Sequence, residues 1–226
     1  METINPSHYP ASRAAGVAGD YINYKLGGPH RLYEQQQVTS ASKERIEGVG
    51  NKYRLEFAIK DSLNEHPQIK CTAEVLYYTN NQQSAPNVTY KLEGEPQNYT
   101  AQKDKEFYNK MKSRSEPLTG EDIPDKFGNI APDMEPILHL AQAASGFVKW
   151  QNSAEETFYR MAIIKSVKQV ISDNAALELH YIMLIHDMVS QEIIPWSMEV
   201  LWDLSEGLRV NNHQRLPKIN PDETSS

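Results

Sequence analysis

The sequence predicts an α+β protein built from two similar halves. Two observations lead to this fold class: the chain repeats itself at an offset of about 126 residues, and each half contains one amphipathic helix followed by alternating strands. A chain of 226 residues is long enough for one large domain or two small ones. Apolar residues make up 39% of it, which supplies a core and excludes a largely disordered chain.

The repeat is visible at both ends of each half. The segment YINY at 21–24 has a counterpart in FVKW at 147–150, which lies 126 positions later. The segment CTAEVLY at 71–77 has one in WSMEVLW at 196–202, 125 positions later. Because both pairs share nearly one offset, we expect the same order of elements, helix and then strands, in each half.

The first predicted helix covers residues 10–26. Its apolar residues fall on one face at helical spacing, and they are Ala14, Val17, Ala18, Tyr21 and Ile22. Gly27, Gly28 and Pro29 follow, so we expect a left-handed glycine cap and then a residue that cannot continue the helix.

The second predicted helix runs from about residue 133 to residue 150. Asp133 is a suitable N-cap, and Pro136 falls in the first turn, where a missing N–H costs little. The apolar stripe of this helix consists of Ile137, Leu138, Ala141, Ala144, Phe147 and Val148.

Strands with period-two alternation follow each helix. In the first half they cover 52–60, 69–77 and 88–92, and in the second half they cover 177–185 and 196–202. A helix packed on a small antiparallel sheet would bury these stripes in each half. Between the halves, residues 106–114 could form a short helix that directs Phe107, Tyr108 and Met111 inward. The predicted boundaries are 1–96 for the first subdomain, 97–117 for a helical linker and 118–226 for the second subdomain, whose polar tail after Leu216 is expected to fray.

Composition restricts the class of partner and the compartment. The formal net charge of −7 disfavours nucleic acid, because phosphate contacts need clustered Lys and Arg. No apolar run is long enough for a membrane span, and the polar residues 1–10 do not resemble a signal peptide. The single cysteine, Cys71, allows no intrachain disulfide. We therefore expect a cytoplasmic protein with no nucleic-acid or membrane partner.

Catalytic and metal-binding patterns are weak. Glu178, His180 and His186 lie on the outward face of one predicted strand, but the two histidines are about 20 Å apart and cannot share a metal ion. Cys71 is at a core-facing position with no adjacent histidine, which is typical of a buried, inert thiol. No phosphate-binding loop and no nucleophile elbow are present, so we expect neither an enzyme nor a bound cofactor or metal.

Several longer strings resemble the latexin family along nearly the whole chain. They are YPASRAA at 9–15, YINY at 21–24, CTAEVLY at 71–77, IPDKFGN at 123–129, WQNS at 150–153 and SQEIIPW at 190–196. The resemblance implies tandem cystatin-like subdomains, each one α-helix packed on a curved four-stranded antiparallel sheet, joined by a helical linker. It also implies a monomeric, tight-binding inhibitor of A/B-type zinc metallocarboxypeptidases that occludes the active-site funnel, with the zinc belonging to the target.

The resemblance directs attention to Gln191, Glu192 and Ile193, which lie between two strongly alternating strands and are expected at a hairpin tip. Gln191 and Glu192 offer hydrogen bonds, while Ile193 could fill an apolar subsite of a target. The alternative is a hairpin whose isoleucines pack inward beneath Trp196. The repeat places His66, Pro67 and Gln68 at the corresponding tip of the first half, as a second contact or, more simply, a surface turn.

Three other modes of action remain open. Insertion of the C-terminal tail is disfavoured, because residues 222–226 carry no large apolar side chain. Cystatin-type inhibition of cysteine proteases is disfavoured because the segment 191–195 lacks the final glycine of the cystatin Gln-x-Val-x-Gly hairpin. A scaffolding role with sulfated glycans would use the lysines of the linker, although the negative net charge predicts modest, salt-sensitive affinity.

Overall fold

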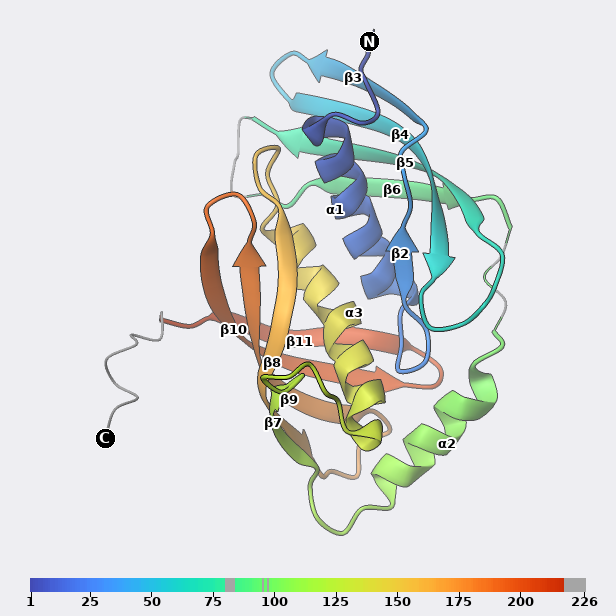
Figure 1. Cartoon of the computed structure of the whole chain (residues 1–226), viewed down its shortest axis with the longest axis vertical. Helices are drawn as coiled ribbons and strands as arrows, with labels where there is room; N and C mark the ends of the chain where they lie inside the picture. Colours follow the sequence, from blue (N-terminus) through green and yellow to red (C-terminus); the bar gives the residue numbers. More distant parts are fainter. Residues whose placement is uncertain (80–83, 95, 97, 218–226) are drawn as a thin grey trace.

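The computed structural model describes residues 1–79, 84–94, 96 and 98–217. Two antiparallel sheets each carry one long helix, and these two helices lie side by side in the middle of the molecule (Figure 1). The first sheet has the order β1-β3-β4-β5-β6, with β2 paired to β4. Its strands are β1 (Glu2–Thr3), β2 (Tyr33–Gln35), β3 (Ser40–Ile46), β4 (Gly50–Asp61), β5 (Ile69–Tyr78) and β6 (Asn87–Leu92).

The second sheet has the order β11-β10-β9-β8-β7. Its strands are β7 (Thr119–Ile123), β8 (Tyr159–Val170), β9 (Leu177–Asp187), β10 (Glu192–Asp203) and β11 (Gly207–Arg215). The α+β fold class and the order of helix and then strands are confirmed. The expected four-stranded sheet accounts for β3 to β6 and for β8 to β11, and the structure adds the shorter strands β1, β2 and β7 at the sheet margins.

Helix α1 (Tyr9–Leu26) buries the predicted face, including Ala14, Val17 and Ile22. Its predicted left-handed glycine cap is wrong, because Gly27 is extended, with φ −72° and ψ 161°. Glycine is required there for a different reason. A Cβ at Gly27 would lie 2.5 Å from the Asn23 carbonyl oxygen and 2.9 Å from the Ala143 Cβ, so only a hydrogen fits.

The second long helix is α3 (Glu135–Gln151), which buries its predicted stripe, including Ile137 and Val148. The prediction that Asp133 caps it is wrong. Asp133 belongs to a preceding 3-10 turn, η1 (Pro132–Met134), and its carboxylate accepts a hydrogen bond from the Lys110 Nζ at 2.7 Å. The 3-10 turn supplies the entry to the helix in place of a side-chain cap.

The two long helices pack antiparallel and at close range. Lys149 of α3 forms an ion pair with Asp20 of α1, while Gly27 contacts Ala143, so the residue numbers run in opposite directions along the contact. A Cβ at Gly146 would lie 2.3 Å from the Asp20 carbonyl oxygen. The backbones therefore approach more closely than any larger residue would allow, and the two halves form one packed unit.

The alternation predicted for the strands is confirmed on β4, β5, β9 and β10, whose inward residues form the two cores. Leu177, Leu179, Tyr181, Met183 and Ile185 are all buried, as are Trp196, Met198, Val200 and Trp202. The sequence did not reveal β8, because two irregularities in its pairing with β9, at 161–163 and 164–166, break the period of two.

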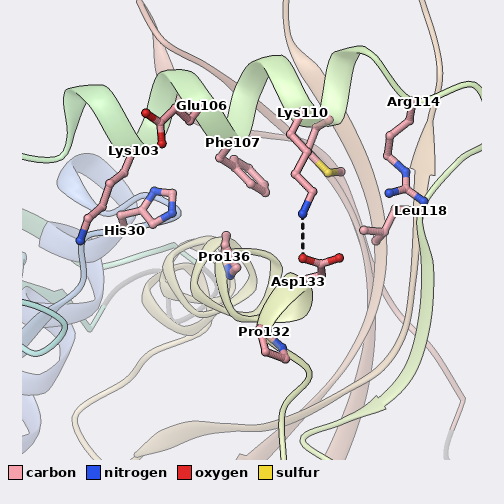
Figure 2. A pocket seen from close by; sticks show the side chains of 11 residues that line it. His30, Lys103, Glu106, Phe107, Lys110, Arg114, Leu118, Pro132, Asp133 and Pro136 are labelled. Carbon is pink, nitrogen blue, oxygen red and sulfur yellow. Dashed lines mark hydrogen bonds and ion pairs between the residues drawn. The ribbon is translucent and has the colours of Figure 1, made fainter.

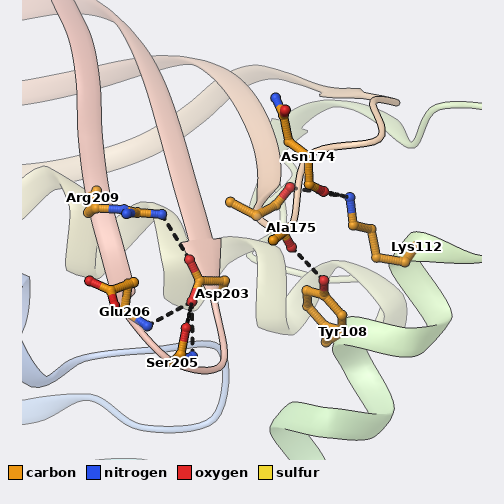
Figure 3. Close-up of polar contacts among 9 residues, drawn as sticks. Tyr108, Lys112, Asn174, Ala175, Asp203, Ser205, Glu206 and Arg209 are labelled. Carbon is orange, nitrogen blue, oxygen red and sulfur yellow. Dashed lines mark hydrogen bonds and ion pairs between the residues drawn. The ribbon is translucent and has the colours of Figure 1, made fainter.

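Helix α2 (Ala101–Lys112) lies inside the predicted linker 97–117 and is longer than the predicted 106–114 helix. It buries Phe107 and Met111, as expected. Tyr108 is half-buried, and its hydroxyl donates to the Ala175 carbonyl, while Lys112 donates to the Asn174 carbonyl (Figure 3). These bonds fasten α2 to the β8–β9 connection. The domain boundaries at 96/97 and 117/118 stay predictions, and the tail at 218–226 lies outside the described residues.

Candidate functional site

The β9–β10 hairpin ends in a turn that its own side chains hold together. The Asp187 carboxylate accepts hydrogen bonds from the Val189 N–H at 2.9 Å and from the Ser190 hydroxyl at 2.8 Å. Gln191 has a left-handed φ of 62°, and its side-chain amide donates to the Met188 carbonyl at 2.7 Å. The turn therefore has a preset shape, which lowers the entropy lost when it contacts a partner.

The predicted tip is displaced from the observed turn. The turn covers residues 188–191, so Gln191 lies in it while Glu192 already opens β10. Glu192 Oε1 accepts a hydrogen bond from Arg215 Nη2 of β11 at 2.9 Å. Of the two alternatives left open for the isoleucines, Ile193 faces solvent at 53% relative exposure, whereas Ile194 is buried at 6%. The alternative in which both isoleucines pack inward beneath Trp196 is therefore wrong for Ile193. Adjacent residues of a strand face opposite sides of the sheet, so Ile193 and Ile194 cannot both face the core.

The hairpin presents two apolar side chains to solvent, Val189 at 49% and Ile193 at 53% relative exposure. Both are among the most exposed large apolar side chains of the described residues. Exposed apolar groups on a rigid element are suited to anchor in a partner's pocket.

The acid that organises the turn is ionised at neutral pH. Burial alone would raise the pKa of the Asp187 carboxyl. The hydrogen bonds from Val189 and Ser190 outweigh burial and hold the pKa of this carboxyl below its ordinary value of 3.8. The turn therefore keeps its carboxylate acceptor throughout the neutral range.

The second predicted contact, His66, Pro67 and Gln68, lies in the β4–β5 connection and lines a cavity of about 300 Å³. The His66 ring stacks on Tyr99, with ring centroids 3.6 Å apart and an interplanar angle of 27°. Pro67 and Gln68 are exposed at the mouth of this cavity. The segment is therefore an irregular loop with a hollow beside it, and residues 66–68 do not form the surface turn that was the simpler expectation.

The structure does not bring the two predicted contacts together. The β9–β10 hairpin is near the C-terminal end of α3, where the Met188 N–H donates to the Phe158 carbonyl at 2.8 Å. The β4–β5 loop is near the C-terminal end of α1, where the Asn64 side-chain amide donates to the His30 carbonyl at 2.9 Å. Because α1 and α3 are antiparallel, their C-terminal ends lie at opposite ends of the helix pair. An 18-residue helix is about 27 Å long, so one compact interface would not cover both contacts.

The segment between α3 and β8 connects the hairpin to the first half. Glu155 in this segment accepts hydrogen bonds from the Lys43 Nζ at 2.8 Å, the Asn51 side-chain amide at 2.6 Å and the Tyr53 hydroxyl at 2.5 Å. All three donors belong to β3 and β4. The β9–β10 hairpin is thus tied through residue 158 to a segment that the first sheet holds in place.

The residues considered for catalysis do not assemble a site. His180 is paired with Glu178 at 2.8 Å on an outward strand face, and His186 faces Arg160 in the neighbouring strand. Cys71 is buried, and burial raises the pKa of its thiol to about 12, so it stays protonated. Within the residues that the structure describes, no group of three His, Cys, Asp or Glu side chains could hold a metal ion.

Comparison with known sequences identifies the family. The latexin family profile matches residues 4–220. The chain belongs to the latexin family. Human latexin is 48% identical over 215 residues, which cover 95% of this chain and 97% of the human protein. Mouse latexin matches with the same identity and coverage. Chicken ovocalyxin-32 is 31% identical over 211 residues, covering 93% of this chain and 76% of ovocalyxin-32.

A second surface of this latexin-family chain lies between α2 and α3. The hollow has a volume of about 250 Å³, and its lining includes Lys103, Lys110 and Arg114. Figure 2 shows Lys110 pointing from α2 to Asp133 at the start of α3, with Lys103 beside His30 and Arg114 beside Leu118. The Lys110 Nζ is paired with Asp133 at 2.7 Å, which partly neutralises the cluster. The sequence had indicated the run of cations but not that η1 and α3 close the other side of the hollow.

Sequence reasoning missed the residues that shape the hairpin. Asp187, Val189 and Arg215 all support or extend the surface around Ile193. The signal available was Asp187 itself, since an aspartate that follows a strand often accepts hydrogen bonds from backbone N–H groups two residues later. Arg215 could not have been found from sequence, because its contact with Glu192 depends on the pairing of β10 and β11.

The length and apolarity of the helices were compared with what a membrane span requires. Among the residues that the structure describes, none of the helices is sufficiently long and apolar to span a bilayer.

Proposed function

We propose that this chain is a tight-binding, stoichiometric inhibitor of A/B-type zinc metallocarboxypeptidases. The observation that carries the proposal is the 48% identity with human latexin over 95% of the chain, since inhibition of this enzyme class is what the resemblance to the latexin family implies. The inhibitor would act by occluding the funnel that leads to the target's active site. The zinc belongs to the target, and the inhibitor needs no cofactor of its own.

The β9–β10 hairpin is the proposed point of entry. Ile193 and Val189 offer apolar anchors, and Gln191 and Glu192 lie between them on the same short segment. An inhibitor with a preformed contact surface loses little conformational entropy on binding, so more of the contact energy appears as affinity. The hydrogen bonds of Asp187 and Gln191 provide such preorganisation.

One hairpin turn is too small for a tight complex. Stable protein interfaces bury about 800 Å² on each partner, so further contacts are required. The segment at 152–158 is the favoured source, because the Met188–Phe158 hydrogen bond places it beside the hairpin. The loop of His66, Pro67 and Gln68 is less suitable as a second contact for the same target, because it lies at the other end of the helix pair.

The test is a titration of purified protein into pancreatic carboxypeptidase A, with papain assayed in parallel. We expect loss of carboxypeptidase activity that is complete at one equivalent of inhibitor, with papain unaffected. Inhibition of papain alone would replace the proposal with cystatin-type inhibition. If neither enzyme responds, the inhibitory function is refuted for these classes.

A second candidate is the binding of sulfated glycans to the hollow between α2 and α3. Three cations line this hollow: Lys103 and Lys110 lie about two helical turns apart on α2, and Arg114 follows the end of the helix. On a heparin column at low salt, we expect the double variant Lys103→Ala/Arg114→Ala to elute earlier than the unchanged protein. The matched control is Lys70→Ala/Lys91→Ala, which removes the same charge from β5 and β6. If the two variants elute at the same salt concentration, the earlier elution results from the lower net charge and the hollow is not a glycan-binding site.

The compartment and the oligomeric state stay predictions. We propose that the protein is cytoplasmic and acts as a monomer. Fractionation of cells and sedimentation of the purified protein would test these two proposals.

A further inference from the structure

Two arginines near the β9–β10 hairpin have no carboxylate partner. Arg13 of α1 donates from its Nη1 to the Glu156 carbonyl at 3.2 Å, and Arg160 of β8 is exposed. Among the residues that the structure describes, neither guanidinium forms an ion pair, whereas Lys43 and Lys149 each meet a carboxylate. In a chain with a net charge of −7, unpaired guanidinium groups at one place favour a partner that brings its own carboxylates.

Each of these arginines is stacked on an aromatic ring. The Arg13 Cζ lies 5.6 Å from the centroid of the Tyr9 ring. The Arg160 Cζ lies 5.3 Å from the centroid of the Phe158 ring. A ring beneath the guanidinium plane restricts its orientation and leaves the N–H groups at its edge available, so the fork can bind a carboxylate with two hydrogen bonds. We call Tyr9, Arg13, Phe158 and Arg160 the arginine patch.

The arginine patch is continuous with the β9–β10 hairpin. The Phe158 carbonyl accepts a hydrogen bond from the Met188 N–H of the hairpin turn at 2.8 Å. On its other side, the Phe158 ring lies against α1, where a Cβ at Gly16 would meet the Phe158 Cε2 at 3.8 Å. Figure 1 shows the start of α1, the loop that enters β8 and the tip of the β9–β10 hairpin at the same end of the molecule. A single partner can therefore contact the hairpin and the patch at once.

The carboxylates of the connecting segment leave the charge of the patch in place. The Glu155 side chain is turned to the first sheet, where it accepts hydrogen bonds from the Lys43 Nζ at 2.8 Å and the Tyr53 hydroxyl at 2.5 Å. Glu156 contributes its backbone carbonyl to Arg13, and its carboxylate forms no ion pair within the part of the chain that the structure describes. The patch therefore keeps a positive charge at one end of a negatively charged protein, and an acidic partner surface would be attracted to that end.

We propose that the arginine patch is a second contact surface for the target of the β9–β10 hairpin, and that it binds carboxylates on the rim of that enzyme's active-site funnel. The proposal rests on the proposed inhibition of A/B-type metallocarboxypeptidases. Tyr9 is 78% exposed, and tyrosine and arginine are enriched among the residues that anchor protein interfaces. The patch supplies contact area that the hairpin lacks, and stacking already restrains its side chains, so little entropy is lost when they bind.

The experiment measures the association rate and the inhibition constant of the full-length protein for carboxypeptidase A at low and at high salt. The variant is Tyr9→Ser/Arg160→Gln, which removes one ring and one charge at two exposed positions. We expect the inhibition constant to rise about tenfold, and association to become slower at low salt and less dependent on salt. The Tm of the free protein should not change, because both side chains are exposed.

The matched control is Phe127→Ser/Lys126→Gln in the connection between β7 and η1. Phe127 is 77% exposed and the Lys126 Nζ lies 5.1 Å from its ring centroid, so the control removes an equally exposed ring and the same charge. It should inhibit as the unchanged protein does. Normal inhibition with an unaltered salt response by Tyr9→Ser/Arg160→Gln, or equal losses in the two variants, would overturn the role of the arginine patch while the proposed function stands. Absence of inhibition by the unchanged protein would refute both.

Discussion

Tyr21 of α1 packs edge-on against Trp150 of α3, with ring centroids 4.7 Å apart. Tyr24 makes the reciprocal contact with Phe147 at 5.0 Å. In the internal repeat, Tyr21 corresponds to Phe147 and Tyr24 to Trp150. Each residue thus contacts the counterpart of the other, which is the pattern of a two-fold interface between identical subunits. Trp150 packs against the core of the first half and Tyr24 against the core of the second.

Because α1 and α3 approach so closely, a single methyl group added at Gly146 should strongly destabilise the fold. Gly146→Ala would place its Cβ 2.3 Å from the Asp20 carbonyl oxygen, so the helices must separate or the backbone must shift. We expect a loss of about 2 kcal/mol or more in the free energy of unfolding, measured by urea denaturation.

The control for this variant is Gly16→Ala, also in a helix, where the nearest atom is Cε2 of Phe158 at an ordinary 3.8 Å. Alanine has the higher helix propensity, so this variant should be neutral or up to about 1 kcal/mol more stable. Equal effects of the two substitutions would contradict the packing described for Gly146.

Glu155 predicts a dependence of stability on pH. Burial alone would raise the pKa of its carboxyl, but the hydrogen bonds from Lys43, Tyr53 and Asn51 outweigh burial and lower it below the ordinary value of 4.5. A carboxyl whose pKa is lower in the folded state stabilises the fold above its unfolded pKa. This stabilisation is lost as the pH falls below about 4.5 and through the lower folded value.

The variant Glu155→Gln should cost about 2 kcal/mol at pH 7, because it removes the charge from three hydrogen bonds. Urea denaturation at pH 7 and pH 3.5 would measure the difference. The gap between the variant and the unchanged protein should narrow at the lower pH. A constant gap would show that Glu155 does not contribute through its ionised form.

The inhibitory hairpin predicts a loss of potency without unfolding. The triple variant Gln191→Ala/Glu192→Ala/Ile193→Ala should raise the inhibition constant for carboxypeptidase A at least about tenfold, because it removes one apolar anchor and two polar contacts. The control is Ile171→Ala, which removes a comparably exposed isoleucine, 48% against 53%, from the β8–β9 connection. Normal inhibition by the triple variant would mean that the enzyme contacts another surface.

Preorganisation of the same hairpin can be tested separately. Asp187→Ala removes the acceptor for Val189 and Ser190, so we expect about 1 kcal/mol lower stability and about tenfold weaker inhibition. The matched control is Asp203→Ala, since Asp203 organises the β10–β11 turn in the same way (Figure 3). Both variants should lose similar stability in thermal unfolding, but only Asp187→Ala should lose potency. If Asp187→Ala and Asp203→Ala inhibit the enzyme equally well, the rigidity of the β9–β10 turn does not contribute to inhibition.

The patterns in the sequence were reliable where burial is periodic. Residues such as Ile22, Val75 and Leu179 lie on one face of a regular element, and each is fully buried as predicted. The β8 strand escaped detection because its bulges displace the alternation. The short strand β3 escaped because only Ala41 of its seven residues is buried, and its remaining residues carry no apolar stripe.

The candidate site was predictable in part. That a hairpin joins these two strands followed from their strong alternation on either side of a short segment, but the sequence left open whether Ile193 faces solvent or the core. The exact turn did not follow, because its geometry depends on which residues pair across β9 and β10 and on the left-handed backbone of Gln191. The separation of the two predicted contacts also required coordinates, since sequence similarity between the halves contains no information about their relative orientation.

By itself, the sequence determined the α+β class, the duplication, the long helices and the family to which the chain belongs. These properties depend on short-range periodicity and on strings of residues that are local in the chain. The tertiary structure alone decided the antiparallel helix pair, the reciprocal contacts of Tyr21 and Tyr24, and the joining of Arg13 and Arg160 in one patch. Each of these joins residues far apart in the sequence, and steric fit between surfaces, which no local pattern encodes, determines whether they meet.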